Sequence, residues 1–306
     1  MAAAAHASPG AAWPTDAWQG DAWQGDDRAG TGNTLTVLGC DGSWPGPGGA
    51  ASGYLVRSGP TTLWLDAGPG TFANLQRVLD PALVDAVVLS HEHPDHWTDL
   101  ESFAVWRRQS AATAPVPVYA PPGLRRRSYF ADDPLLGWQE IGPSYQVVVG
   151  QMACRFVATD HGPPTLAVRI DQVGTDHVGP ASPASPAGPA SPAGHVGSAG
   201  KTGHVGPDPG RALAYSADSG PDWTAEELGT GLGTLLCEAT YTSQDEGRFR
   251  HLSGRQAGRM AAAARVGRLV VTHRWPTVSA DALAAEAAAA FCRPVDQAVA
   301  GRVFPW

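Results

Sequence analysis

A dense group of ionisable side chains follows a short apolar run. Three histidines and one aspartate lie within residues 91–96, whose sequence is His-Glu-His-Pro-Asp-His. Imidazole and carboxylate groups are ligands for zinc and other borderline or hard divalent cations. In an extended segment His91 and His93 point to the same side and can bind one ion, while Asp95 and His96 can reach a second ion close by. Two neighbouring cations can clamp the attacking and leaving oxygens of a displacement reaction. The alternative is a solvated loop that happens to be rich in histidine.

A buried strand is expected to position this group. Residues 86–89 are apolar and rich in β-branched side chains, which indicates a buried strand. The polar residues that follow, and Pro94 with no N–H, cannot continue it. The candidate ligands therefore lie in a loop at the carboxyl end of a strand, where α/β folds usually place their ligands.

The segment His91-Glu92-His93-Pro94-Asp95-His96 resembles the HxHxDH signature of the metallo-β-lactamase fold. The resemblance extends from residue 34 to residue 300, and more specifically to the ribonuclease Z-like branch and its actinobacterial relatives, some of which hydrolyse cyclic nucleotides. It implies an α/β (α+β) fold, a four-layer αββα sandwich with a dinuclear site at one edge between the sheets.

Other segments resemble the remaining metal motifs of that family. His161 lies at the end of one expected strand, Asp218 ends the run 211–218, and His273 follows the run 268–272. Ala217 stands where the family usually has glycine. The resemblance implies a first ion held by His91, His93 and His161, a second held by Asp95, His96 and His273, and Asp218 as the bridge. An alternative makes Asp218 the N-cap of a helix over residues 221–228.

Three more residues receive supporting roles from the resemblance. The segment Asp66-Ala67-Gly68 resembles the Asp-x-Gly motif, in which the carboxylate orients a metal-binding histidine. The alternative for Asp66 is a turn residue or an N-cap before a helix over residues 71–79. Glu238, which is costly to bury unpaired, and the His-x-Ser segment at His251 resemble the pair that distinguishes phosphodiesterase-like members from β-lactamase-like ones. By resemblance, His251 assists departure of the leaving oxygen and is held by Glu238. The alternative is a purely structural pair.

Composition and charge narrow the range of expected substrates. The net charge is −8, and Lys201 is the only lysine, although arginines cluster at residues 107–108 and 125–127. Affinity for nucleic acid without sequence preference is therefore expected to be weak, which favours a small phosphodiester over extended RNA. The four cysteines form no CxxC pair and indicate reduced thiols. No signal-peptide pattern or membrane-length apolar run is present, so a cytoplasmic protein without a membrane partner is expected.

Low-complexity sequence flanks and interrupts the expected domain. Residues 1–32 repeat the pentapeptide Asp-Ala-Trp-Gln-Gly and are expected to be a disordered tail, and residues 33–306 form the metallo-β-lactamase-fold domain. A Pro/Ala/Gly insert spans residues 174–210. It does not look like the structured arm with which transfer-RNA-processing members grip RNA in this region.

The patterns predict strands and helices along the domain. We expect strands over residues 34–39, 51–57, 61–65, 86–89, 115–119, 145–159, 211–218, 234–241 and 268–272, an edge strand over 294–303, and helices over 71–79, 98–109, 253–266 and 280–291.

The sequence therefore predicts a dinuclear-metal-dependent hydrolase. The preferred substrate is a small phosphodiester such as a 3',5'-cyclic nucleotide, with Asp95, Glu238 and His251 as the catalytic residues. The alternatives are a ribonuclease Z-like endonuclease that processes transfer-RNA 3' ends, or a thioesterase, lactonase or β-lactamase. Zinc is the expected metal because imidazole dominates the ligand set, although Mn²⁺ and Fe²⁺ suit it as well. The family resemblance also suggests a homodimer, although no feature of the sequence establishes one.

Overall fold

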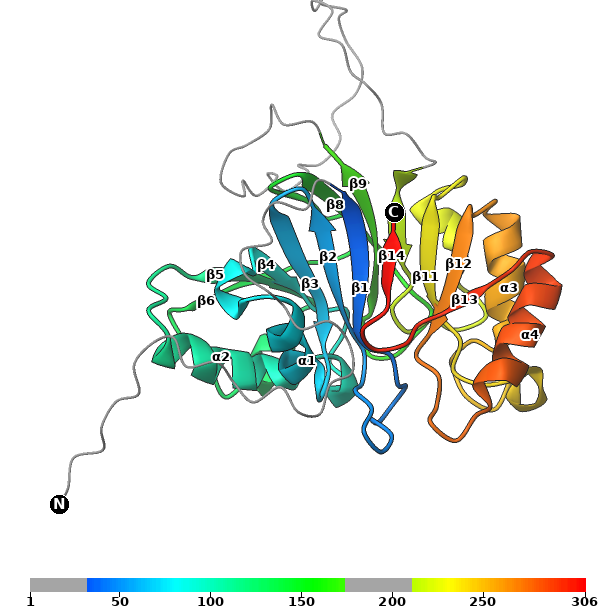
Figure 1. Ribbon diagram of the computed structural model, residues 1–306, viewed down its shortest axis with the longest axis horizontal. Helices are drawn as coiled ribbons and strands as arrows, with labels where there is room; N and C mark the ends of the chain where they lie inside the picture. The colour runs from blue at the N-terminus through cyan, green and yellow to red at the C-terminus, as the bar shows by residue number, and fades with distance from the viewer. Residues whose placement is uncertain (1–31, 174–210) are drawn as a thin grey trace, which may run out of the picture.

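Two seven-stranded sheets pack face to face, and helices cover their outer faces (Figure 1). The computed structural model describes residues 32–173 and 211–306. The four-layer αββα sandwich expected from the resemblance is confirmed. The expected tail, apart from Gly32, and the expected insert lie outside the described residues.

The first sheet has the strand order β14-β1-β2-β3-β4-β5-β6. Neighbouring strands are antiparallel from β14 to β3 and parallel from β3 to β6. Helices α1 and α2 cover its outer face (Figure 1). The bounds are β1 (Asn33–Gly39), β2 (Gly53–Ser58), β3 (Thr61–Ala67), α1 (Thr71–Val78), β4 (Ala86–Val88), α2 (Asp99–Gln109), β5 (Val116–Ala120), β6 (Leu136–Glu140) and β14 (Val303–Pro305).

The second sheet has the order β13-β12-β11-β10-β9-β8-β7. Its strands are parallel from β13 to β10 and antiparallel from β10 to β7. Helices α3 and α4 cover its outer face (Figure 1). The bounds are β7 (Gln146–Val149), β8 (Met152–Ala158), β9 (Leu166–Gln172), β10 (Leu213–Tyr215), β11 (Thr234–Glu238), α3 (Gly254–Ala263), β12 (Arg268–Thr272), α4 (Ala280–Phe291) and β13 (Asp296–Gln297).

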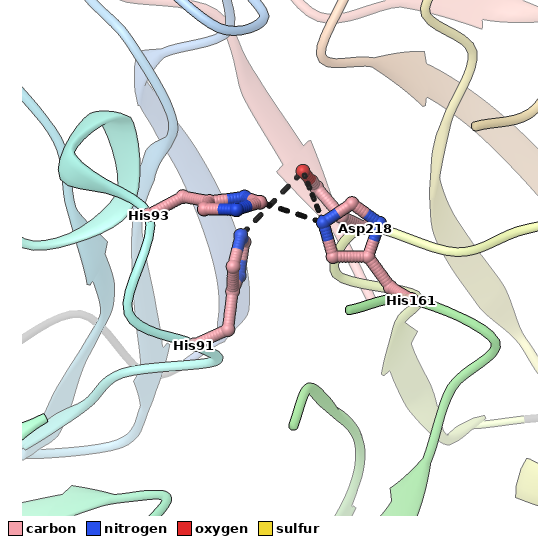
Figure 2. A group of neighbouring side chains, drawn as sticks. All are labelled: His91, His93, His161 and Asp218. Carbon is pink, nitrogen blue, oxygen red and sulfur yellow. Dashed lines mark hydrogen bonds and ion pairs between the residues drawn. The ribbon is translucent and has the colours of Figure 1, made fainter. Parts of the chain in front are cut away.

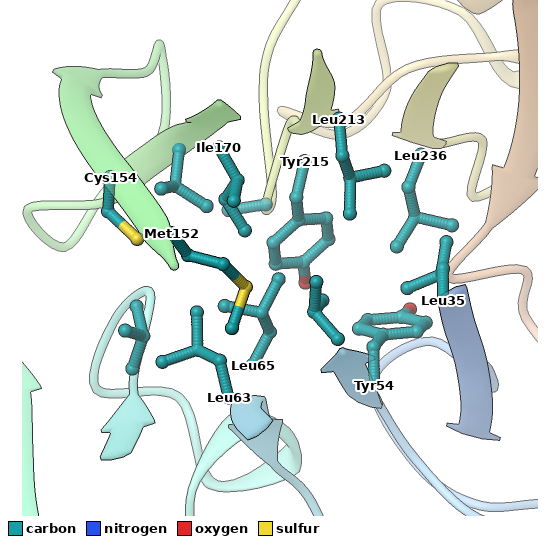
Figure 3. Close-up of a cluster of buried hydrophobic side chains, with 14 of the residues drawn as sticks. Leu35, Tyr54, Leu63, Leu65, Met152, Cys154, Ile170, Leu213, Tyr215 and Leu236 are labelled. Atoms are coloured by element: carbon teal, nitrogen blue, oxygen red, sulfur yellow. The ribbon is translucent and has the colours of Figure 1, made fainter. Parts of the chain in front are cut away.

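The central core fills the space between the two sheets (Figure 3). Leu63 and Leu65 of β3 point into this core, whereas Trp64 between them packs with Phe72 and Phe103 under the helices. Successive side chains of a strand face opposite sides, so a strand covered on both faces is apolar throughout. The same alternation places Val270 in the central core and its neighbours under α3 and α4.

The C-terminal segment departs from the sequence-based expectation. The single edge strand expected over residues 294–303 is wrong in extent, because the segment forms two short edge strands, β13 on the second sheet and then β14 on the first. Strand β6 was not predicted, since its sequence mixes glycine, polar and aromatic residues. The helix considered over residues 221–228 is also wrong, because only the short 3-10 turn Ala225–Leu228 forms there.

Two further expectations concern the cysteines and membrane-spanning segments. The four cysteines are free thiols, three at least partly buried, whereas Cys292 is exposed. Within residues 32–173 and 211–306, no helix combines the length and apolarity needed to cross a bilayer.

Candidate metal centre

The loop after β4 carries four of the candidate ligands. His91 follows β4 in the loop, His93 lies on extended backbone, and the 3-10 turn Pro94–His96 then places Asp95 and His96 in the interior. The loop rests directly on Gly68, because a Cβ atom there would lie 2.0 Å from the carbonyl oxygen of Asp95. The glycine of the Asp-x-Gly segment is therefore required by close packing.

One group of ligand atoms gathers around one oxygen of Asp218 (Figure 2). The Oδ2 atom of Asp218 lies 3.6 Å from His91 Nε2 and 3.8 Å from His161 Nε2. His93 Nδ1 lies 3.2 Å from His161 Nε2. These four side chains come from three loops, after β4, β8 and β10, and they converge on one point.

A second group gathers around the other oxygen of the same carboxylate. Asp218 Oδ1 lies 3.2 Å from His96 Nε2 and 3.4 Å from His273 Nε2. The Asp95 Oδ2 atom lies 3.3 Å from His273 Nε2 and 3.4 Å from His96 Nε2. The structure therefore brings together all seven residues named from the sequence, and Asp218 stands between the two groups.

Hydrogen bonds fix which nitrogen of each buried histidine carries the proton. His96 Nδ1 lies 2.7 Å from Asp66 Oδ2, and a carboxylate can only accept, so Nδ1 donates. The Ser90 hydroxyl donates to Asp66 as well, so it must accept from His91 Nδ1, 3.0 Å away. In both histidines Nε2 is therefore the nitrogen left to face the Asp218 carboxylate, and it is the atom that would bind a cation.

Hydrogen bonds orient His273, on the second sheet, in a similar way. The Thr240 hydroxyl donates to Glu238 Oε2 over 2.6 Å and therefore accepts from His273 Nδ1 over 2.9 Å. His273 Nε2 faces Asp95 and Asp218 and donates to Asp95 Oδ2 over 3.3 Å, so it would lose this proton on binding a cation. These orienting residues, Ser90 and Thr240, were not predicted from the sequence. The sequence signal that could have identified Thr240 was its position two residues after Glu238.

The unsatisfied atoms fit a pair of cations. His91 Nε2, His96 Nε2 and Asp218 Oδ1 are buried and have no hydrogen-bond partner. With Nε2 deprotonated, as a metal ligand requires, each is an acceptor that faces other acceptors, which is unfavourable unless positive charge lies between them. A set of imidazoles with two carboxylates suits zinc, and also manganese or iron. The residues present therefore fit two divalent ions, one in each group.

The ionisation of the centre follows from the same contacts. Burial raises the pKa of Asp95, but His96 and His273 outweigh this effect and hold that pKa below its usual range. Burial also raises the pKa of Asp218, and the neighbouring histidines again outweigh it, so that this pKa lies well below its ordinary value. Burial lowers the pKa of His96, whereas Asp218 and Asp95 raise it well above its ordinary value. The carboxylates stay ionised and attract positive charge.

His251 lies at the edge of the centre, held by Glu238. Its Nδ1 atom is 3.2 Å from Glu238 Oε1, so Nδ1 carries a proton. That same nitrogen is the atom closest to Asp218, at 3.9 Å, and a protonated nitrogen cannot bind a metal. Burial lowers the pKa of His251, but Glu238 and Asp218 outweigh this effect and raise the pKa to about 9. The expected contact between Glu238 and His251 is present.

Asp66 takes the supporting position expected for it. Its carboxylate accepts from the backbone and hydroxyl of Ser90, from His96 and from the hydroxyl of Tyr215. The alternative of a helix N-cap is wrong, because α1 begins after Gly70.

Comparisons with known proteins agree with this geometry. A family model described as a β-lactamase superfamily domain matches residues 61–181. An uncharacterised protein of Mycobacterium tuberculosis is 36% identical over 274 residues, which cover 88% of this chain and 91% of that protein. Ribonuclease Z of Thermobifida fusca is 30% identical over 288 residues, covering 84% of this chain and 89% of that protein. The crystal structure of YhfI from Bacillus subtilis, a metallo-β-lactamase fold protein, has a TM-score of 0.70 at 23% identity and covers 89% of this chain and 99% of that chain.

Proposed function

The chain belongs to the metallo-β-lactamase superfamily, and we propose that it is a dinuclear-metal phosphodiesterase acting on small substrates such as 3',5'-cyclic nucleotides. The observation that carries this proposal is the Glu238–His251 pair beside the seven-residue centre. A histidine held at the edge of the centre, with one nitrogen bonded to a carboxylate, is suited to proton transfer.

The ions and the side chains have different roles in the proposed reaction. When bound, the two ions supply Lewis acidity, lower the pKa of water and stabilise negative charge on the phosphate. In the proposed hydrolysis, an oxygen–phosphorus bond forms from water and the bond to the sugar oxygen breaks. The carboxylate of Asp95 accepts the proton of the attacking water. His251 Nε2 gives a proton to the departing sugar oxygen, while Glu238 holds the ring through Nδ1.

Charge pairing around the centre favours a small substrate. Arg127 makes two hydrogen bonds to Glu92, the residue between His91 and His93. Arg250, beside His251, lies 3.5 Å from Asp160. Because carboxylates neutralise these arginines, they offer little net attraction to a long polyanion. One phosphate held by the metal centre suits this surface better than extended RNA.

A ribonuclease Z-like activity is the second candidate. It is supported by the 30% identity with the Thermobifida fusca protein of that name over most of both chains. Such an enzyme would use the same centre and differ only in how the substrate is held. Assays of cyclic AMP, a transfer-RNA precursor, a thioester and a lactam in parallel distinguish these functions. Cleavage of the precursor alone would contradict the proposal.

The role of His251 is tested by its replacement with alanine. We expect His251→Ala to lower the turnover of a chromogenic phosphodiester by about 10²–10⁴-fold, the usual contribution of general acid–base catalysis. Bound metal, measured by elemental analysis, should not change. The control Arg125→Ala removes an exposed ion pair with Asp132 and a hydrogen bond to the Ala131 carbonyl, and it should leave turnover within about twofold of the native value. Undiminished turnover of the alanine variant would refute the role.

A further inference from the structure

Four aromatic side chains form a connected cluster next to the metal centre. This aromatic rim consists of Trp44, Tyr241, Phe249 and Trp275. The Trp275 ring lies 6.1 Å from Trp44, 6.0 Å from Tyr241 and 4.9 Å from Phe249 between ring centroids. Tyr241 is buried beneath the others, whereas Trp44 is 44% exposed and Phe249 is 45% exposed.

The rim is attached to residues of the centre from three directions. The Ser43 backbone N–H donates to Asp95 Oδ2 over 2.9 Å, and the Ser43 hydroxyl accepts from Trp275 Nε1 over 3.0 Å. Trp275 follows His273 by two residues, and Phe249 precedes His251 by two residues. The Tyr241 hydroxyl is shared by the carbonyls of Phe249 and His251.

The exposed parts of Trp44 and Phe249 therefore lie beside residues of the centre. The Arg248 guanidinium lies over the Phe249 ring, 5.9 Å from its centroid, and so covers one of its two faces. His93, His161 and His251 are its partly exposed members, whereas the other candidate ligands are buried. Among the described residues only three aromatic side chains are more than 40% exposed, namely Trp44, Tyr129 and Phe249. Two of the three belong to the rim. Rigid aromatic faces exposed beside a catalytic centre are suited to a flat, apolar group of the substrate.

We propose that the exposed side chains of Trp44 and Phe249, supported by Trp275, bind the nucleobase of the substrate by stacking. This inference rests on the proposed phosphodiesterase function, since it assigns the base to the rim and the phosphate to the metal centre. Every base has a π-face, so stacking binds nucleotides with little preference among bases. The rim thus favours nucleotides over phosphodiesters that lack a ring.

The experiment compares a nucleotide with its base-free counterpart. The substrates are cyclic AMP and methyl riboside 3',5'-cyclic phosphate, assayed with Trp44→Ala and Phe249→Ala. For cyclic AMP we expect KM to rise by about 5- to 100-fold in each variant, with kcat within about twofold, as loss of one stacking partner predicts. For the base-free phosphate neither constant should change. The aromatic replacements Trp44→Phe and Phe249→Tyr should restore KM for cyclic AMP.

The matched control is Tyr129→Ala, which removes an aromatic side chain that is 89% exposed and lies outside the rim. We expect both constants to stay at native values for both substrates. Calorimetric titration with adenosine 5'-monophosphate and ribose 5-phosphate supplies a readout without turnover. The rim variants should bind the nucleotide about 5- to 100-fold more weakly and ribose 5-phosphate equally well.

Each outcome decides the inference. An unchanged KM for cyclic AMP, or an equal rise for both cyclic phosphates, overturns it. A change of oligomeric state by light scattering with unchanged KM also overturns it, because the rim would then be a contact between copies. If cyclic AMP is not hydrolysed at all, the proposed function fails, and the calorimetric titration alone decides whether the rim binds a base.

Discussion

Two carboxylates outside the ligand set orient four imidazoles of the site. Asp66 binds His96 directly and His91 through Ser90. Glu238 binds His251 directly and His273 through Thr240. Because each chain of hydrogen bonds ends on an acceptor, the three buried histidines keep Nδ1 as the donor and leave Nε2 as the atom that would bind a cation. Such outer contacts set both the direction and the basicity of a metal ligand.

The Thr240 hydroxyl gives the sharpest test at this scale. Thr240→Val keeps the shape of the side chain but leaves His273 Nδ1 without an acceptor. We expect metal affinity, measured by competition with a chelator, to fall by about 10- to 100-fold. Thr240→Ser retains the hydroxyl and should stay within about threefold of the native affinity. Native affinity in the valine variant would show that the hydroxyl does not orient His273.

The loop between β1 and β2 fastens the first sheet to the end of β12. The Gly42 N–H donates to the carbonyl of Arg274 over 2.9 Å, and Ser43 donates to Asp95. A Cβ atom on Gly42 would lie 2.3 Å from the carbonyl oxygen and 2.9 Å from Nδ1 of His273. Only glycine permits this approach, so the loop and the candidate ligand constrain each other.

A methyl group at position 42 should therefore displace His273. We expect Gly42→Ala to lower kcat by about 10²-fold, since small misplacements of a catalytic group have effects of this size. The matched control is Gly142→Ala, where the added Cβ meets nothing within 4 Å, and it should keep native kcat. Steady-state kinetics of both variants checks the prediction. Equal activity in the two would show that the loop yields without moving the ligand.

Features that depend on neighbouring residues could be predicted from the sequence, whereas features that depend on the pairing of distant segments could not. The spacing of His91, His93, Asp95 and His96 is local and visible in the sequence, and the remaining motifs follow strands of clear apolar pattern. The link from Thr240 to His273 depends on the parallel pairing of β11 with β12, which no local pattern encodes. The path of residues 294–303 depends likewise on which sheet edges remain open, so its two short edge strands on different sheets were predicted as one.

The centre joins the two halves of the molecule. Four candidate ligands follow β4 in the first sheet, while His161, Asp218 and His273 follow strands of the second sheet. Bound ions would hold the sheets together at this edge, because the seven side chains converge only in the folded chain. A ligand that binds only the folded state stabilises it in proportion to the logarithm of its concentration over Kd.

Removal of metal should therefore lower the thermal stability of the whole fold. At an ion concentration of about 100 times Kd the stabilisation is about 2.7 kcal/mol, which corresponds to a fall of about 5–10 °C in Tm on adding a chelator. Calorimetric scans with chelator, and again after zinc is restored, measure it. A Tm that is the same in both scans would contradict this coupling.

The number of ions per chain tests the central claim most directly. Elemental analysis of the purified protein, after weakly bound metal is removed by dialysis, should give about two equivalents of divalent metal per chain, summed over zinc, manganese and iron. The variant Asp218→Ala loses the carboxylate shared by both groups and should retain less than about one equivalent. A native protein with no tightly bound metal, or an alanine variant that keeps both ions, would contradict the account.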